Sequence, residues 1–493
     1  QAYPDFYKAT KQGDIKPIYG AEFTFINESD LDICKHGMDI PLDEAIYTVF
    51  DIETTGLSVN FDKIIEIAAV RVKNGQILDE YQTYVNPERP ISQLTTKITS
   101  IKNSDVAVAP KIEEVIKEFK AFFEGTIMVA HNAQFDIGFI ESELKRNNLF
   151  ESELPYIDTL SLARNCYGHV LKRFNLKTVS NYFKVSLVQH HRAIYDTRAT
   201  SDIFISMVRD IRKQGITNVA ELNRLSEKSS GYKHVISKHI NVLVKNEVGL
   251  KNLFKITSIA NTINFHKEAR LLKSVLEKHR EGLLVGSGCM NSVLFESALN
   301  KSYEETKELA KYYDYLEVQP LSDFSHLESD MENAKENIKT TILKIIQIGK
   351  ELNIPVVATS DAHHIIKSEK KYRDIYVQTP VVGGGRHPLV RYDDIPSQYF
   401  RTTKEMLDEF SFLDEETQRE IVITNTNLIN DDIDFVKVFK PELYAPTDDF
   451  LALEGIPSIE NKLIKMVGDK SKEIYGREVP QIVKDRIDKE IKS

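Results

Sequence analysis

The 493-residue chain is too long for one ordinary domain, and its length predicts two to four domains. Its hydrophobic content of 41% and charged content of 28% are those of a soluble globular protein. The net charge of −10 argues against a large passive nucleic-acid-binding surface, but not against a nuclease, whose acids gather around metal ions.

Short features of the sequence indicate the cellular compartment of the protein and whether the chain is a whole protein. No apolar run approaches the roughly 20 residues that span a bilayer, and no signal peptide opens the sequence. Three scattered cysteines (Cys34, Cys166 and Cys289) are too few for a disulfide framework and favour a reducing, cytoplasmic location. Gln1 in place of an initiator Met and the abrupt end at "DKEIKS" indicate a piece of a longer protein.

The first part of the chain predicts a mixed sheet flanked by helices. Residues 15–29 read as one strand and a polar loop. Apolar patterns and turn signals then predict four strands, at 46–53, 63–72, 77–85 and 126–131. Helical patterns lie at 111–123, 135–146, 158–166, 176–183 and 195–213.

The second part reads as another α/β unit after a polar connector at residues 214–232. Short apolar strands at 239–246, 282–288, 315–320 and 354–364 alternate with helical segments such as 336–352. Such alternation favours a parallel sheet or barrel. The last 80 or so residues are charged and helical in pattern.

Two acids in an apolar strand, Asp51 and Glu53 in "FDIETTGL", raise the first chemical question. Side chains alternate along a strand, so both carboxylates project from one face, where they repel each other unless a cation lies between them. Asp136 in "AHNAQFD" and Asp196 in "HHRAIYD" each enter a helix, and His191 precedes Asp196 by five residues. Carboxylates suit Mg²⁺ or Mn²⁺, and a neutral His can act as general base.

The strings "FDIETTG", "AHNAQFD" and "HRAIYD" resemble the three motifs of the DnaQ-like 3′–5′ exonucleases with the D-E-D-D-h signature. The resemblance covers roughly residues 44–212 and implies an RNase H-like fold and two metal ions, Mg²⁺ or Mn²⁺. It assigns the metal-binding and catalytic acids to Asp51, Glu53, Asp136 and Asp196. The catalytic histidine is His191, because His190 lies one residue too far from Asp196.

Residues 1–43 and 233–385 resemble the two parts of a PHP domain, a distorted (β/α)₇ barrel whose loops can bind a metal cluster. The resemblance offers Glu22, His239, Cys289, Asp361 and His363 as ligands for Zn²⁺ or Mn²⁺. The opening H-x-H and D-H segments of that family are missing, so this set is incomplete. Taken alone, Glu22 can equally be a metal ligand or an exposed acid, and Cys289 a metal ligand or a core residue. His364 can likewise be a ligand or a loop residue.

An exonuclease inserted into a split PHP domain resembles the PolC-type replicative DNA polymerases of Gram-positive bacteria. That resemblance places the start of a polymerase region at residues 386–493 and the connector at 213–232, and implies a DNA-directed DNA polymerase. It also implies DNA, a sliding clamp and other replisome proteins as partners, and no membrane. No polymerase catalytic acids can be identified in the chain.

The sequence leaves two alternative functions open. One is a non-catalytic PHP scaffold that binds partners and carries a vestigial exonuclease. The other is an RNA-trimming exonuclease of the same fold. The intact five-residue signature disfavours the first, and the flanking PHP strings disfavour the second.

Overall fold

The computed structural model describes residues 2–186, 192–227, 229–380, 385–438, 447–453 and 455–492. The chain divides into a large compact unit, Thr10–Val436, and a small one made of Gln1–Ala9 and Lys437–Ser493. None of the described helices is long and apolar enough to cross a membrane.

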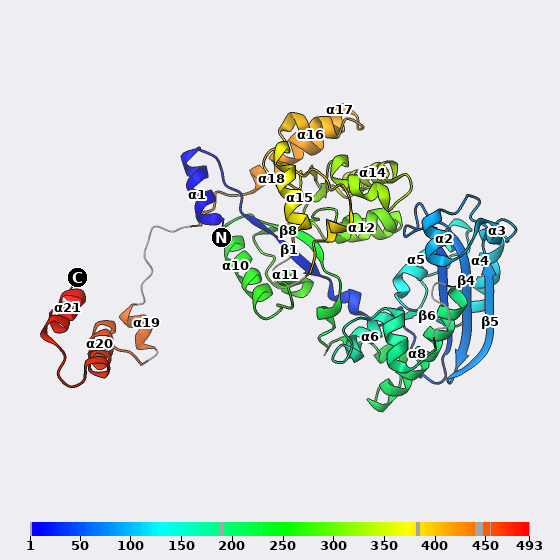
Figure 1. Ribbon diagram of the computed structural model, residues 1–493, viewed down its shortest axis with the longest axis horizontal. Helices are drawn as coiled ribbons and strands as arrows, with labels where there is room; N and C mark the ends of the chain where they lie inside the picture. Colours follow the sequence, from blue (N-terminus) through cyan, green and yellow to red (C-terminus); the bar gives the residue numbers. More distant parts are fainter. Residues whose placement is uncertain are drawn as a thin grey trace. The chain divides into compact units, whose positions relative to one another are not determined.

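A six-stranded mixed sheet lies in the large unit (Figure 1). Its spatial order is β2-β7-β6-β3-β4-β5, and its strands are β2 (Cys34–Lys35), β3 (Ile46–Thr54), β4 (Ile64–Lys73), β5 (Gln76–Tyr84), β6 (Ile127–Ala130) and β7 (Tyr156–Asp158). β3, β6 and β7 run parallel, whereas β4 is antiparallel to both β3 and β5. This topology confirms the expected mixed α/β, RNase H-like exonuclease fold.

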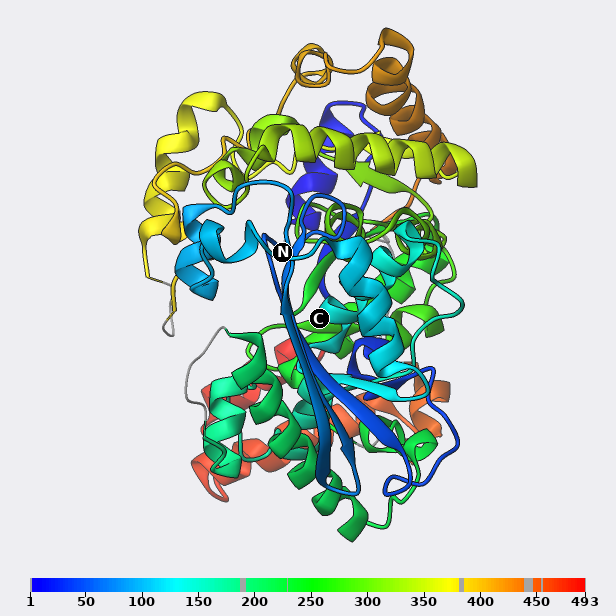
Figure 2. The ribbon, with the colours of Figure 1, turned by 90° about the vertical axis from the view of Figure 1, so that its right-hand side faces the viewer.

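Helices cover both faces of this sheet, which explains why β4 is buried along nearly its whole length. α4 and α5 pack on the face that carries Phe50 and Ile52. α6, α7 and α8 pack on the face that carries Tyr47 and Val49. Because every second side chain of a strand points to the same face, Asp51 and Glu53 lie on this face too. The acids therefore belong to the α8 side of the sheet. Figure 2 shows the long strands from the side.

The helices of this part are α2 (Gln93–Thr99), α3 (Asn103–Val106), α4 (Ile112–Phe123), α5 (Ala133–Arg146), α6 (Thr159–Tyr167), α7 (Leu176–Phe183) and α8 (Ala193–Lys213). Each helix and strand expected between residues 46 and 213 is present. The short elements β2, β7, α2 and α3 were not expected, because two to seven residues hold too little of a hydrophobic period to be recognised.

The polar stretch 214–232 is not a free connector. It contains η2 (Val219–Glu221), α9 (Arg224–Glu227) and the start of η3 (Gly231–His234), and Val219 packs in the core beneath the sheet. The Asn223 side chain accepts hydrogen bonds from the backbone of Ile33 and Cys34 and donates one to the Cys34 carbonyl. The sheet and its core thus extend beyond the limits of 44 and 212 predicted from the motifs.

A second sheet has the order β10-β8-β1-β9, with β1 (Gly20–Ile26), β8 (Lys238–Val244), β9 (Arg270–Leu272) and β10 (Leu283–Gly286). β11 (Leu316–Val318) and β12 (Val356–Ala358) form a parallel pair, which a bridge between Gly286 and Tyr315 joins to β10. β1 and β8 are neighbours although the six-stranded sheet lies between them in the sequence.

The expectation of a parallel sheet or barrel is wrong for β8, which runs antiparallel to β1 and β10. A whole sheet intervenes between β1 and β8, so no single helical crossover fixes the direction of β8. Within the described residues these six strands form two sheets, and a closed seven-stranded barrel is not seen.

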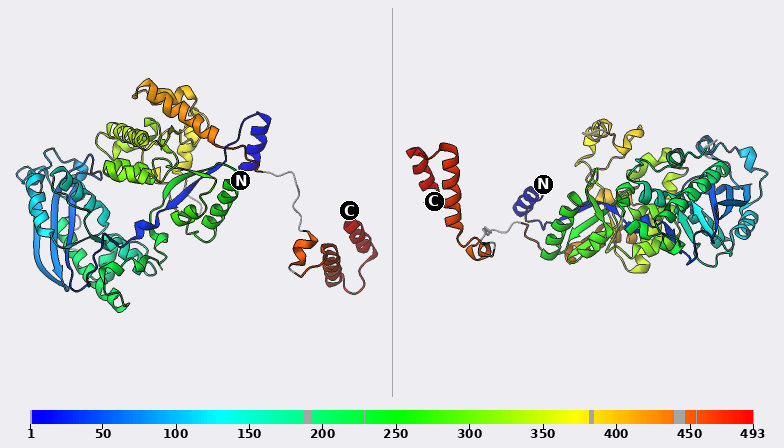
Figure 3. Two further views of the ribbon diagram at one scale, coloured as in Figure 1. Left: turned by 180° about the vertical axis from the view of Figure 1, so that it is seen from behind. Right: turned by 90° about the horizontal axis from the view of Figure 1, so that it is seen from below.

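The remaining helices of the large unit are α10 (Glu247–Asn261), α11 (Lys273–Lys278), α12 (Val293–Asn300), α13 (Tyr303–Ala310), α14 (Ala334–Leu352), α15 (Lys370–Gln378), α16 (Thr403–Glu409), α17 (Glu415–Arg419) and α18 (Asn425–Asp432). Shorter helical turns are η1 (Glu28–Leu31), η4 (Leu321–Ser329), η5 (Lys367–Glu369), η6 (Pro388–Arg391) and the π-helical η7 (Glu420–Thr424). α1 (Tyr3–Gln12) begins the described chain, and α19 (Asp448–Ala452), α20 (Ile459–Tyr475) and α21 (Gln481–Lys492) form the end of it (Figure 3).

The loop after β3 is anchored to the second part of the large unit. Ser58 Oγ donates a hydrogen bond to the Leu299 carbonyl at 2.5 Å. Asn60 Nδ2 donates to the carbonyls of Leu299 and Lys301, at 3.0 and 2.8 Å. These bonds hold the segment that directly follows the two strand acids.

Candidate active site

Three of the predicted acids meet at one end of β3. Ligand oxygens of Asp51, Glu53 and Asp196 all lie within 4.8 Å of one another, a spacing that one or two metal ions can bridge. Asp51 and Glu53 come from the same face of β3, and Asp196 comes from the first turn of α8. Residues far apart in the sequence are thus brought together by the packing of α8 on the sheet.

Small residues allow α8 to approach the strands closely. Ala68 on β4 pairs with Asp51 in the sheet register and packs against Ala193 at the start of α8. Thr197 Oγ1 then donates to the Ala68 carbonyl at 3.2 Å. A larger side chain at Ala68 would push the helix, and Asp196 with it, away from the acids of β3.

Asp136 adjoins this group but is not part of the closest set. It is buried in the first turn of α5, and its Oδ1 accepts a hydrogen bond from the Ile52 backbone N–H at 3.2 Å. That bond holds the carboxylate against β3 at the residue that separates the two strand acids in sequence. The helix N-terminus also favours an anion at this position.

Burial and mutual repulsion strongly disfavour ionisation of these acids. Burial, then Asp136, raises the pKa of Asp51 well above its usual range, and burial likewise raises the pKa of Asp136. Burial, then Asp196, raises the pKa of Glu53 to about 8. A divalent cation would remove this repulsion and let all the groups ionise, so the donor set fits a hard, oxygen-preferring metal.

The predicted catalytic histidine, His191, lies outside the described residues, as does its neighbour His190. The chain is described again from Arg192, immediately before α8. Assignment of His191 therefore stays a prediction from the motif.

Glu66 on β4 was not singled out from the sequence. It is fully buried and pairs with Glu53 in the sheet register. Its carboxylate accepts hydrogen bonds from Gln82 Nε2 (2.8 Å) and the Ala193 backbone N–H (3.3 Å), and Arg192 Nη2 lies 3.5 Å away. Glu66 thus holds the start of α8, which carries Asp196. The signal available in the sequence was an acid inside the apolar run "IIEIAAV".

The second predicted cluster is also partly assembled. Ligand atoms of Glu22, His239 and Cys289 lie within 4.8 Å of one another. His239 Nδ1 is 3.4 Å from Glu22 Oε2 and 3.2 Å from Cys289 Sγ. The hydrogen bond between His239 and Glu22 lowers the pKa of Glu22 and raises that of His239, while burial raises the pKa of the Cys289 thiol.

Asp361 and His363 lie at the edge of this cluster rather than within it. Burial raises the pKa of Asp361 to about 6, with Glu22 as the next cause, so the two carboxylates are close enough to repel. Gln398 Nε2 donates to Asp361 Oδ2 at 2.6 Å, and His363 Nδ1 lies 2.7 Å from the Asp361 carbonyl. His364 Nδ1 lies 3.0 Å from the Ile366 carbonyl, in the loop beyond.

A further buried acid beneath this cluster, Glu317 on β11, also escaped the sequence reasoning. Its carboxylate accepts hydrogen bonds from Asn241 Nδ2, Thr359 Oγ1 and the Gly288 backbone N–H. Burial raises its pKa. These bonds tie β8 and β11 to the segments that directly follow β10 and β12.

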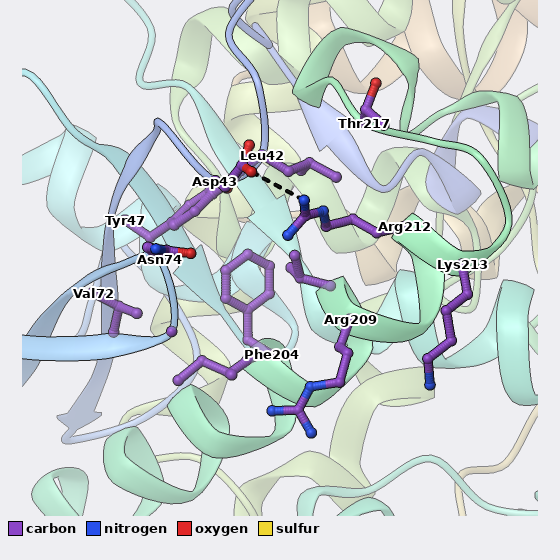
Figure 4. Close-up of a pocket in the computed structure, with 13 residues that line it drawn as sticks. Leu42, Asp43, Tyr47, Val72, Asn74, Phe204, Arg209, Arg212, Lys213 and Thr217 are labelled. Atoms are coloured by element: carbon purple, nitrogen blue, oxygen red, sulfur yellow. Dashed lines mark hydrogen bonds and ion pairs between the residues drawn. The ribbon is translucent and has the colours of Figure 1, made fainter.

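The pocket in Figure 4, of about 510 Å³, lies at the other end of β3 from the acids. Its wall includes an ion pair between Arg212 and Asp43 at 3.0 Å. None of the predicted site residues is among its lining residues, which are Leu42, Asp43, Tyr47, Val72, Asn74, Gly75, Phe204, Ile205, Val208, Arg209, Arg212, Lys213 and Thr217. The candidate chemistry is therefore not located in this pocket.

A known protein family matches the part of the chain that contains the first cluster. Residues 48–204 match the RNase_T family, described as "Exonuclease". Among solved structures, Exonuclease X in complex with 5′ overhanging duplex DNA is 29% identical, with a TM-score of 0.29, and covers 36% of this chain and 99% of that one. The nuclease domain of 3′hExo, a DEDDh family member bound to rAMP, is 18% identical with a TM-score of 0.32, over 35% of this chain and 95% of that one.

Curated relatives match the whole chain. "DNA polymerase III PolC-type" of Bacillus subtilis (strain 168) is 41% identical over 100% of this chain and 34% of its own length. The protein of the same name from Streptococcus pneumoniae is 37% identical over 100% of this chain and 34% of its own length. The chain thus spans about a third of the length of these relatives. The chain is therefore similar over its whole length to one third of the PolC-type DNA polymerase III proteins, and residues 48–204 match an exonuclease family.

Proposed function

We propose that this chain carries a metal-dependent 3′–5′ exonuclease that proofreads for a replicative DNA polymerase by hydrolysing 3′-terminal nucleotides. The observation that carries the proposal is the meeting of Asp51, Glu53 and Asp196 within 4.8 Å, inside the segment that matches an exonuclease family. The alternative of a vestigial site is disfavoured, because the described acids of the signature are intact and converge.

In the mechanism, Asp51, Glu53, Asp136 and Asp196 would hold two Mg²⁺ or Mn²⁺ ions. When bound, such ions lower the pKa of the attacking water and stabilise charge on the in-line transition state. Asp136, held by the Ile52 N–H, and Asp196, held through the start of α8, fix the oxygens that face the strand acids. His191 would take the proton of the attacking water as general base.

Selectivity for errors can arise without reading sequence. A mispaired 3′ end frays at less energetic cost than a paired one, so it enters the site more often. Leu57, 71% exposed in the loop that follows the strand acids, is suited to pack against the terminal base. The similarity to DNA polymerase III proteins supports DNA rather than RNA as the substrate. A cytoplasmic setting, and a sliding clamp and other replisome proteins as partners of the whole polymerase, are part of the proposal.

The direct test is release of nucleotides from 5′-labelled single-stranded DNA with Mg²⁺, with Mn²⁺ and with EDTA. We expect stepwise shortening from the 3′ end with either metal and none with EDTA. A matched RNA strand tests the alternative substrate. If the RNA is shortened equally fast or faster, the proposed function changes from DNA proofreading to RNA trimming. If neither strand is shortened with any metal, the proposal of an exonuclease is wrong.

Replacing Glu66 by Gln tests the support of α8. The neutral amide keeps the shape but weakens the interactions with Arg192 and the Ala193 N–H, so Asp196 loses its fixed position. We expect kcat to fall about 10–100-fold, as for groups that orient metal ligands, and the Mg²⁺ concentration for half-maximal activity to rise. Glu151→Gln, at an exposed glutamate paired with Lys120 of α4 and not in contact with α8, is the matched control and should change neither. An unaltered Mg²⁺ requirement in Glu66→Gln would show that Glu66 has no such role.

We further propose that Glu22, His239 and Cys289 bind one Zn²⁺ or Mn²⁺, with Asp361 and His363 as additional donors. The mixture of thiol, imidazole and carboxylate suits these metals. The prediction is retention of one Zn²⁺ per chain after gel filtration, measured by elemental analysis, and its loss in His239→Ala. Cys34→Ser, at a buried thiol outside the cluster, should retain the metal. Zinc retained equally by His239→Ala would place it elsewhere.

A further inference from the structure

Helix α15 presents most of its large apolar side chains to solvent, whereas two of its charged residues are half-buried. Tyr372, Ile375 and Tyr376, at positions i, i+3 and i+4, are 61%, 64% and 66% exposed. Arg373 and Asp374 are half-buried, and Val377 is the fully buried residue of the helix. A helix packed for stability alone has the opposite pattern, so the outer face of α15 is suited to contact a ligand. α15 is labelled in Figure 1.

Positive charge accompanies the exposed tyrosines. Residues 364–378 contain four Lys or Arg against two Asp or Glu, in a chain of net charge −10. Lys371 Nζ lies 5.0 Å from the centroid of the Tyr372 ring. Lys370 is committed to Asp374 and Asp394, whereas neither Lys367 nor Lys371 has an ion pair within the described part of the chain. Lys371, beside the Tyr372 ring, and Lys367, four residues before it in the chain, are therefore available to an anionic partner.

The face is held in place by contacts on the inner side of the helix. Arg373 Nη2 donates to Gln398 Oε1 at 3.3 Å, and Gln398 also donates to Asp361. The imidazole of His387 lies 6.1 Å from the Tyr376 ring. A preorganised surface loses less conformational entropy when a ligand binds.

We propose that the face formed by Lys371, Tyr372, Ile375 and Tyr376, with Lys367 beside it, binds single-stranded DNA. Aromatic rings that stack on bases, interleaved with cations that reach phosphates, are the combination by which proteins bind single strands. Bases of an intact duplex are already stacked, so a paired strand cannot use the rings in this way. The face is separate from the acids of β3, and the proposal rests on the proposed function only in taking DNA as the substrate.

The test measures binding of 5′-fluorescein-labelled dT20 by fluorescence anisotropy to the full chain. All variants carry Asp51→Ala, which prevents loss of the probe by hydrolysis. Tyr372→Ala with Tyr376→Ala should raise Kd at least about tenfold, because each stacked base contributes that order of affinity. The corresponding Phe variants keep the rings and should bind like the parent. Tyr475→Ala, at a tyrosine 49% exposed on α20, is the matched control.

Salt dependence and duplex binding complete the test. Lys367→Gln with Lys371→Gln should reduce the slope of log K against log salt by about 0.7 for each phosphate that a lysine no longer neutralises. The tyrosine changes should leave binding of a blunt duplex of the same length unaltered. The proposal would be overturned if the double Ala variant had an unchanged Kd for dT20, or if its binding of duplex weakened equally. It would also be overturned if the tyrosine changes altered only the oligomeric state of the protein. Because hydrolysis is blocked in every variant, this outcome is independent of whether the unsubstituted chain releases nucleotides.

Discussion

Asp51→Asn should lower the rate of 3′-nucleotide release by about a thousandfold or more at saturating Mg²⁺. Asp51 is at the centre of the acid cluster, within 4.8 Å of Glu53 and Asp196 and close enough to Asp136 for mutual repulsion. The amide has the same shape as the carboxylate but carries no charge. It would therefore bind a divalent ion weakly and could not keep two metal ions in place. The effect should appear in kcat, because the substitution removes stabilisation of the transition state.

Asp79→Asn is the matched control for this substitution. Asp79 lies on β5 of the same sheet and is ion-paired with Arg71 at the surface, away from the cluster. Its replacement should leave the rate within about twofold of the parent, since surface ion pairs contribute little. Single-turnover hydrolysis of 5′-labelled DNA by both variants makes the comparison. Activity that survives Asp51→Asn would assign the hydrolysis to the Glu22–His239–Cys289 cluster or to a contaminant.

Without metal, the folded chain should lose stability as the pH rises from about 5 to 8. Glu53 has a pKa of about 8 in the folded protein, against 4.5 for an ordinary glutamate, so the folded state binds the proton more tightly than the unfolded one. Its stabilising contribution is complete below pH 4.5 and is lost as the pH rises through 8. A shift of this size corresponds to at most about 5 kcal/mol in the free energy of unfolding.

Urea unfolding at several pH values, in EDTA and in Mg²⁺, measures this effect. Mg²⁺ should restore stability at pH 8, because it binds the ionised acids of the folded state only. Asp51→Asn should flatten the dependence in EDTA, since it removes a carboxyl whose own pKa is raised well above its usual range by burial and by Asp136, while Asp79→Asn should not. A pH dependence identical in the parent and Asp51→Asn would show that the acids do not repel as the structure indicates.

The two predictions give Asp51→Asn opposite effects on activity and on metal-free stability. The same crowding of carboxylates that favours a divalent cation destabilises the fold when the cation is removed. A substitution that merely damaged the structure would lower both quantities, so measuring both distinguishes a metal ligand from a structural residue.

The sequence alone determined the local arrangement of the site. Alternation along β3 places Asp51 and Glu53 on one face, and the helical patterns place Asp136 and Asp196 in first turns, where anions are favoured. These properties depend on residues close in the chain, and the long strands and helices between 46 and 213 were predicted for the same reason. The family resemblance of the motifs, which depends only on residue order, was also confirmed.

Interactions between distant residues were decided only by the tertiary structure. The direction of β8, the packing of 214–232 against the core and the burial of Glu66 and Glu317 depend on partners far away in the chain. On α15 the tyrosines are exposed, whereas Val377 is buried and Arg373 donates a hydrogen bond to Gln398. Local periodicity can show that a helix has two different faces, whereas only the fold around it determines which face is covered.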